Sequence, residues 1–177
     1  DASRTFNIST AASFVVAGTG VKVAKHGNRS MTSRSGSADV LEALGVDITL
    51  SPEKVAECIE TFGLGFMFAP SLHPAMKYAM CARKSLAVRT VFNILGPLCN
   101  PAGVKRQVIG VFDKKFTERM AEVLKLLGAK HAMIVHGNDG LDEISTTDGT
   151  KYTELTPDGV IHSGMLTPSD FGLPVSS

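Results

Sequence analysis

The polar segment from Lys25 to Asp39 contains the residue types that bind anions. It combines lysine, histidine and arginine with serine, threonine and asparagine side chains, and it has almost nothing apolar to bury. Gly27 and Gly36 would let backbone amides approach a ligand closely. Gly36 and Ser37 also precede an expected helix, whose N-terminal N–H groups would point at a phosphate. The segment predicts a phosphate-type anion site, and a solvated connector rich in serine is the alternative on composition alone.

Two other groups of residues could contribute to such a site. Asn7, Ser9 and Thr10 stand at the start of the first expected helix, where hydroxyls and amides could contact an anion or a metal. Capping of the helix explains Ser9 or Thr10 equally well. Asp142 and Glu143 are adjacent acids in a glycine-containing loop, and such hard oxygen ligands suit Mg²⁺, which commonly bridges carboxylates and phosphates. Solvent-facing charge is the alternative for this acidic pair.

His73 and Arg83 are ten residues apart on a helix that the pattern predicts from about His73 to Leu86. This spacing places the two side chains within about 80° of each other around the helix axis. An arginine can hold a carboxylate by two parallel hydrogen bonds, so a substrate with a carboxylate could lie along this helix. A surface arginine on an amphipathic helix is the alternative.

The elements that must position these residues alternate between strand and helix. Apolar patterning predicts strands at 21–24, 66–69, 108–112 and 132–135, and helices at 9–18, 37–45, 51–63, 73–86 and 116–127. Residues 93–103, with two prolines and two glycines, predict a loop. Residues 152–162 predict a hairpin around Asp158 and Gly159.

This order of elements is typical of an α/β protein with a largely parallel sheet flanked by helices. The length of 177 residues favours a single domain over 1–177. Ligand sites in such folds usually lie beyond the carboxyl ends of the strands. The loops at 25–29 and 136–143 follow two of the expected strands and are therefore the informative ones.

Composition excludes several classes of function. The chain has 18 Lys and Arg against 17 Asp and Glu, so no global field would attract nucleic acid or an anionic membrane. No apolar run approaches the roughly 18 residues of a membrane helix, and residues 1–4 have no signal-peptide pattern. Cys58, Cys81 and Cys99 are widely spaced and odd in number, which fits neither a disulfide framework nor a CxxC metal site. We expect a soluble protein in the reducing cytoplasm.

Several longer blocks carry a family resemblance. Residues 25–29 read KHGNR, and residues 35–45 read SGSADVLEALG. Further blocks follow in a fixed order: TFNISTAA at 5–12, HPAMK at 73–77, RTVFNILGPL at 89–98, NPA at 100–102 and GLDEIS at 140–145. Together they span essentially the whole chain and resemble the anthranilate phosphoribosyltransferases. Several blocks in fixed order are far more specific than any one short motif.

The resemblance implies a nucleoside phosphorylase/phosphoribosyltransferase-type catalytic domain that acts in tryptophan biosynthesis. The reaction would transfer the phosphoribosyl group of phosphoribosyl pyrophosphate (PRPP) to anthranilate, with Mg²⁺ as cofactor and no covalent catalytic residue. The residues implied for PRPP are Asp1, Asn7, Ser9, Thr10, Lys25, Asn28 and Ser37. Those implied for anthranilate are His26, Asn28, His73 and Arg83. Those implied for the metal are Ser9, Asp142 and Glu143.

The resemblance also predicts that the chain is part of a longer, homodimeric protein, truncated at both ends, whose isolated fragment would be inactive. Family members have a GTGGD turn before the TFNIST-type block, and its glycines are absent here. A pyrimidine nucleoside phosphorylase is one alternative, disfavoured by KHGNR and HPAMK. A non-catalytic relative that binds nucleic acid is another, disfavoured by the balanced charge and the acidic pair. A folded but inert structural domain is the third.

Overall fold

The computed structural model describes residues 6–30, 35–76, 78–79, 85 and 90–176 of the chain. These residues form two compact units, which divide between Gly103 and Val104. The expected organisation as a single α/β domain over 1–177 therefore stays a prediction.

The first unit is built around a pair of parallel strands. Its elements are α1 (Ile8–Gly18), β1 (Val23–Gly27), α2 (Ser37–Ala43), α3 (Pro52–Phe62), β2 (Leu64–Phe68), α4 (Ala69–Leu72), the 3-10 helix η1 (Pro74–Met76) and α6 (Phe92–Leu98). Strands β1 and β2 pair in register from Val23 opposite Leu64 to Gly27 opposite Phe68. The loop after β1 and the turn after β2 therefore leave the same edge of this small sheet.

Local sequence signals explain why α3 and β2 form where they do. The Ser51 hydroxyl accepts a hydrogen bond from the Lys54 amide, Pro52 occupies the first helical turn, and Gly63 ends α3 with φ of 77°. A Cβ on Gly65 would lie 2.5 Å from Ile59 Cγ1, so α3 packs closely on the start of β2. These contacts fix the direction in which β2 runs beside β1.

The core of the first unit lies under α2. Ala38, Leu41 and Ile48 are buried together, and Phe66 and Phe68 of β2 pack against them. The helix that follows the polar segment is thus anchored on the strand pair by its apolar face. Burial of these side chains positions the N-terminal end of α2 near the end of β1.

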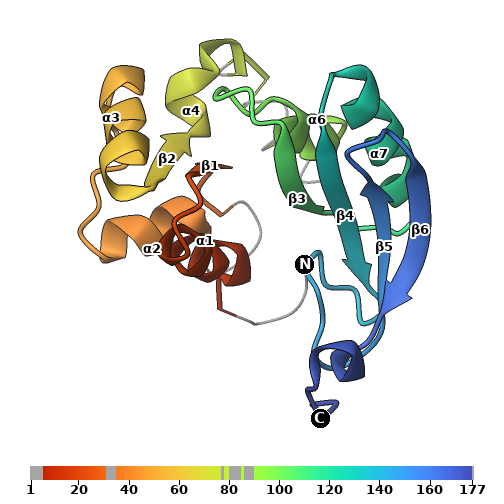
Figure 1. Ribbon diagram of the computed structural model, residues 1–177. Coiled ribbons are helices and arrows are strands. Elements are labelled where there is room, and N and C mark those ends of the chain that lie inside the picture. The colour runs from red at the N-terminus through yellow and green to blue at the C-terminus, as the bar shows by residue number, and fades with distance from the viewer. Residues whose placement is uncertain (1–5, 31–34, 77, 80–84, 86–89, 177) are drawn as a thin grey trace. The chain divides into compact units, whose positions relative to one another are not determined.

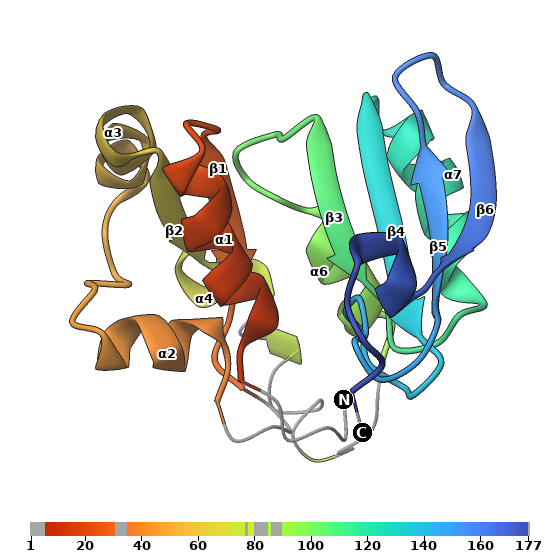
Figure 2. The same cartoon turned by 60° about the horizontal axis from the view of Figure 1, so that its bottom comes forward.

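The second unit is a mixed sheet with one main helix. Its elements are β3 (Arg106–Gly110), α7 (Phe116–Leu126), β4 (His131–Gly137), β5 (Thr150–Leu155), β6 (Ile161–Leu166) and the 3-10 helix η2 (Pro168–Phe171). The strand order is β3-β4-β5-β6, with β3 and β4 parallel and the other two pairs antiparallel. Helix α7 covers one face of β4 and β5 (Figures 1 and 2), where Met120 and Leu124 are buried with Ile134 and Leu155.

The α/β class with helices flanking the sheets is confirmed. Parallel pairing occurs where a helix connects successive strands, and antiparallel pairing includes the predicted hairpin around Asp158 and Gly159. The prediction of the α3 helix, from Ser51 to its glycine stop at Gly63, is confirmed as well. Within the described residues, no helix has the length and apolar character to cross a membrane.

Three local predictions were wrong. The cap of α1 is Asn7, whose side chain accepts from the Thr10 amide, and not Ser9 or Thr10. His73 does not start the predicted helix, because it is the C-cap of α4 and the 3-10 helix η1 follows it. Residues 78–79 and 85 are helical, and the rest of the predicted range up to Leu86 lies outside the described residues. The expected loop at 93–103 contains the helix α6, where Pro97 lies close to the C-terminal end and removes only one backbone hydrogen bond.

Candidate active site

The first turn of α1 and the middle of β1 meet through a lysine. Lys25 Nζ donates a hydrogen bond to Ser9 Oγ over 3.1 Å. Because Asn7 caps the helix, the Ser9 hydroxyl is not needed as the cap and is turned to this lysine instead. The N-terminus of a helix carries partial positive charge and orphan amides, so a cationic side chain beside it makes a local anion-binding position.

Thr10 lies directly behind this position. Its side chain is 2% exposed, and its hydroxyl has no hydrogen-bond partner among the described residues. A buried hydroxyl without a partner is costly and therefore uncommon, and such groups are often explained by an absent ligand or water. Thr10 therefore adds a polar group to the first turn of α1 that no described residue satisfies.

His26 and His73 form a pair at the carboxyl ends of the two strands. Their Nε2 atoms are 3.2 Å apart and their rings meet at 67°, with centroids 5.0 Å apart. Burial lowers the pKa of His26, the nearby His73 lowers it further, and a hydrogen bond to the Gly96 backbone opposes both. The lowered pKa favours the neutral form of the His26 imidazole at pH 7.

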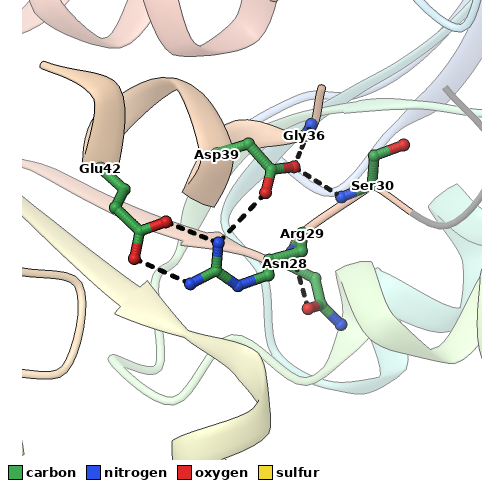
Figure 3. Close-up of polar contacts among 6 residues, drawn as sticks. All are labelled: Asn28, Arg29, Ser30, Gly36, Asp39 and Glu42. Carbon is green, nitrogen blue, oxygen red and sulfur yellow. Dashed lines mark hydrogen bonds and ion pairs between the residues drawn. The ribbon is translucent and has the colours of Figure 1, made fainter. Parts of the chain in front are cut away.

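The segment after β1 is tied to α2 by ion pairs and backbone hydrogen bonds. Figure 3 shows the Arg29 guanidinium between two carboxylates, with Glu42 held by two bonds of 2.7 and 2.8 Å and Asp39 at 3.2 Å. Arg29 also lies over the Phe68 ring, 5.8 Å from its centroid. The sequence pattern places this arginine among the cations of the polar segment from Lys25 to Asp39. In the structure, Arg29 joins that segment to α2.

Asn28 and Ser37 lie on the two stretches that these bonds join. The carbonyl of Asn28 accepts a hydrogen bond from the Ala38 amide at 3.3 Å. A Cβ on Gly27 would lie 3.2 Å from Ser37 Cβ. The structure therefore brings together the loop after β1 and the first turn of α2.

In the second unit, Asp142 and Glu143 follow a tight loop after β4. The Leu141 amide donates to Asp139 Oδ1 at 3.1 Å, and the Gly137 amide donates to the Leu141 carbonyl at 2.8 Å. A Cβ on Gly110 would lie only 1.6 Å from the Asp142 carbonyl oxygen, so the loop rests directly on the end of β3. The two acids are half-buried and lie at the carboxyl ends of parallel strands.

The predicted residues are thus only partly brought together. Within the first unit, Lys25 contacts Ser9, His26 contacts His73, and Asn28 lies by the start of α2. The acidic pair belongs to the other unit, and Asp1 and Arg83 lie outside the described residues, so their assignments stay predictions. Within the described residues, no three His, Cys, Asp or Glu side chains form a metal-binding group.

Two residues with clear structural importance were missed. Asp39 stands at the third position of α2, where an acidic residue commonly bonds back to the helix start, and this spacing was the available signal. Gly110 gave no signal in the sequence, because its role depends on a loop that lies about thirty residues further along the chain. Cys58 and Cys99 are free thiols, and Cys81 lies outside the described residues.

These features define an α/β protein whose strand ends and helix starts carry a local, hydroxyl-rich cationic site. The sequence model of the glycosyl transferase family, a/b domain, matches residues 1–177. The chain belongs to this family.

Relatives and solved structures agree on a narrower group. The chain is 58% identical to the anthranilate phosphoribosyltransferase of Alkaliphilus metalliredigens over 99% of its own length and 52% of the relative. It is similar to the anthranilate phosphoribosyltransferase structure from Thermus thermophilus, with a TM-score of 0.87, 46% identity, and coverage of 99% of this chain and 51% of that one. It is also similar to the enzyme from Saccharomyces cerevisiae in complex with PRPP and Mg, with a TM-score of 0.86, 35% identity, and coverage of 98% and 48%. The chain spans about half the length of the relatives it matches.

Proposed function

We propose that the protein carrying this chain is an anthranilate phosphoribosyltransferase of tryptophan biosynthesis. It would transfer the phosphoribosyl group of PRPP to anthranilate and release pyrophosphate. The observation that carries the proposal is the 3.1 Å contact between Lys25 Nζ and Ser9 Oγ at the N-terminus of α1. This contact joins the KHGNR and TFNIST blocks, which resemble the family, in one cationic position.

The chemistry requires stabilisation of charge. Breaking the bond between ribose C1 and pyrophosphate gives the sugar oxocarbenium character and the leaving group extra negative charge. Lys25 and the first-turn amides of α1 would stabilise the departing pyrophosphate, since preorganised donors act most strongly where charge develops. Thr10 and Asn7 would hold the ribose or pyrophosphate, together with Ser37, Asn28 and Asp1.

Anthranilate, the acceptor substrate, has to be aligned for attack, and no covalent bond to the protein is required. His26 and His73 would contact the aromatic ring of anthranilate, and Arg83 would bind its carboxylate. Asn28 would align the amine for attack on C1. Holding two reactants in such a geometry removes much of the entropic part of the barrier.

Mg²⁺ is the proposed cofactor, since the similar yeast enzyme forms a complex with PRPP and Mg. The donor set fits this ion, because Asp142 and Glu143 offer half-buried carboxylate oxygens on a backbone fixed against Gly110. The family resemblance implies Ser9 as a further ligand of the ion. When bound, Mg²⁺ would neutralise the charge of the diphosphate.

A comparison of two reactions tests the proposal. The purified whole protein is given anthranilate and PRPP with Mg²⁺, and in parallel a pyrimidine nucleoside with inorganic phosphate. We expect loss of anthranilate fluorescence in the first mixture and no free pyrimidine base in the second. The reverse pattern would replace the proposal by nucleoside phosphorolysis, and DNA binding that weakens steeply with salt would favour a nucleic-acid-binding relative.

The proposal extends to the oligomeric state, the cellular location and the partners of the whole protein. We expect a homodimer in the cytoplasm with no nucleic-acid or membrane partner. The resemblance supports the dimer, and the balanced charge of the chain supports the absence of a nucleic-acid partner. Sedimentation of the whole protein would test the dimer directly.

A further inference from the structure

The carboxylate of Asp39 links the two backbone stretches on which Asn28 and Ser37 lie. Its Oδ2 atom accepts a hydrogen bond from the Ser30 amide at 2.9 Å and from the Gly36 amide at 2.7 Å (Figure 3). Both bonds end on the same oxygen, while Oδ1 accepts from Arg29 at 3.2 Å. One side chain of α2 thus joins the end of the segment after β1 to the start of its own helix.

The backbones that Asp39 joins are in direct contact. A Cβ on Gly36 would lie 2.5 Å from the Ser30 amide nitrogen and 2.7 Å from the Asn28 carbonyl oxygen. Only a glycine allows this approach, which leaves the two amides free to converge on one carboxylate oxygen. A shift of either stretch would therefore break a hydrogen bond to Asp39 as well as a backbone contact.

Arg29 holds both acids of this cluster through ion pairs. The single guanidinium of Arg29 pairs with both Asp39 and Glu42, so these three side chains together keep one net negative charge. Hydrogen bonds from the Ser30 and Gly36 amides, and then Arg29, keep the pKa of Asp39 below its ordinary value, so the carboxylate is ionised at neutral pH. An ionised acceptor makes stronger hydrogen bonds to amides than a neutral one.

We propose that Asp39 is a positioning residue for PRPP, which sets the spacing of Asn28 and Ser37 by accepting the Ser30 and Gly36 amides. The proposal rests on the proposed function, in which Asn28 and Ser37 both contact PRPP, while Asn28 alone also faces the anthranilate amine. Both carboxylate oxygens of Asp39 accept hydrogen bonds from the chain itself, so its role would be exerted through Asn28 and Ser37. Its effect is therefore expected in the binding of PRPP more than in the use of anthranilate.

Three variants of the whole protein separate this role from a general structural one. Asp39→Ala removes the acceptor of both amides. Asp39→Asn keeps one carbonyl oxygen that can take the place of Oδ2, but loses the charge that pairs with Arg29. Glu42→Gln is the matched control, because it weakens the Arg29 ion pair and leaves the Ser30 and Gly36 bonds intact.

Steady-state kinetics with both substrates give the readout. We expect Asp39→Ala to raise the KM for PRPP about tenfold or more, from the loss of two hydrogen bonds to a charged group, and the KM for anthranilate less than about threefold. Asp39→Asn should restore most of the PRPP affinity, to within about threefold of wild type, and Glu42→Gln should stay within about twofold. A folded Asp39→Ala protein with unchanged KM for PRPP would overturn the proposal, and so would equal losses for both substrates.

Two controls keep the result interpretable. If Asp39→Ala does not fold, as judged by circular dichroism, Asp39→Asn decides alone. A tenfold rise of its KM for PRPP would then overturn the proposal, and a rise below threefold with Glu42→Gln near wild type would support it. Activity of the wild-type protein is measured first, so failure of the proposed function appears as no turnover in any sample.

Discussion

The Nε2 atoms of His26 and His73 lie 3.2 Å apart, although 47 positions separate the two residues in the chain. The parallel pairing of β1 and β2 produces this contact, because His26 stands at the end of β1 and His73 follows β2 by one short helical turn. Two imidazoles at this distance cannot both carry a proton on the facing nitrogen without repulsion. The fold therefore couples the protonation of one ring to that of the other.

Removing His73 should shift the titration of His26. Burial is the largest cause of the lowered pKa of His26, and the charge of His73 is the next. In His73→Gln the pKa should rise toward the ordinary value near 6.5 but stay below it, since burial remains. Titration of the imidazole by NMR checks this, and an unchanged or lower pKa would contradict the coupling.

The same pKa predicts how stability depends on pH. A histidine whose folded pKa is lowered binds fewer protons than its unfolded counterpart below about pH 6.5. The folded state should therefore lose stability as the pH falls from about 6.5 through the folded pKa, and His26→Gln should lose less over this window. Urea unfolding of both proteins at pH 7.5 and pH 5.5 measures the difference; a steeper loss for His26→Gln would be inconsistent with this assignment.

Gly110 should be essential to the acidic loop. In Gly110→Ala the new methyl group would meet the Asp142 carbonyl oxygen at 1.6 Å, so the loop must move. We expect a loss of about 1–3 kcal/mol in the free energy of unfolding, as for other overpacked positions, and a raised Mg²⁺ requirement. Gly18→Ala is the matched control, since no atom lies within 4 Å of its Cβ position at the end of α1 and alanine suits a helix. Equal stability of the two variants would count against the packing argument.

Much of the fold follows from local signals, and the rest depends on contacts distant in sequence. Ser51, Pro52 and Gly63 predict α3 because capping and termination act within one turn. The choice of Asn7 over Ser9 as the cap of α1 could not be predicted, since both residue types cap well and only the position of Lys25 separates them.

In the candidate site, too, local signals predict some features and contacts distant in sequence determine the others. The polar segment at 25–39 could be singled out from its composition, and its anion-binding role stays a prediction. The sequence could not show that Arg29 pairs with Asp39 and Glu42. The pairing of His26 with His73 also depends on strand register, which no local pattern determines.

Lys25 should be needed for PRPP. Lys25→Met removes the cation at the start of α1, and a lost hydrogen bond to a charged group costs about 1.5–3 kcal/mol. We expect the KM for PRPP to rise roughly tenfold or more, since about 1.4 kcal/mol corresponds to a factor of ten. The matched control is Lys22→Met, whose lysine pairs with Glu60 on the surface and should change KM less than about twofold. Similar kinetics of the two variants would remove Lys25 from the site.

Arg83 should bind the carboxylate of anthranilate. Arg83→Ala loses a bidentate partner for the substrate carboxylate, so the KM for anthranilate should rise roughly tenfold or more while the KM for PRPP changes little. Initial rates with either substrate varied measure both values. Unchanged turnover and Michaelis constants in an intact enzyme would refute the assignment.

The proposed site would serve a metal-assisted transfer of phosphoribose to anthranilate. The most direct measurement follows anthranilate loss and pyrophosphate release together, in the whole protein and in an Asp142→Asn, Glu143→Gln double variant. We expect one pyrophosphate per anthranilate consumed in the wild type, a rate that chelation of Mg²⁺ abolishes, and a loss of at least about a hundredfold in the variant, from the removal of two ligand charges. Anthranilate that stays unconsumed in the wild type, or a double variant as active as wild type, would contradict this assignment.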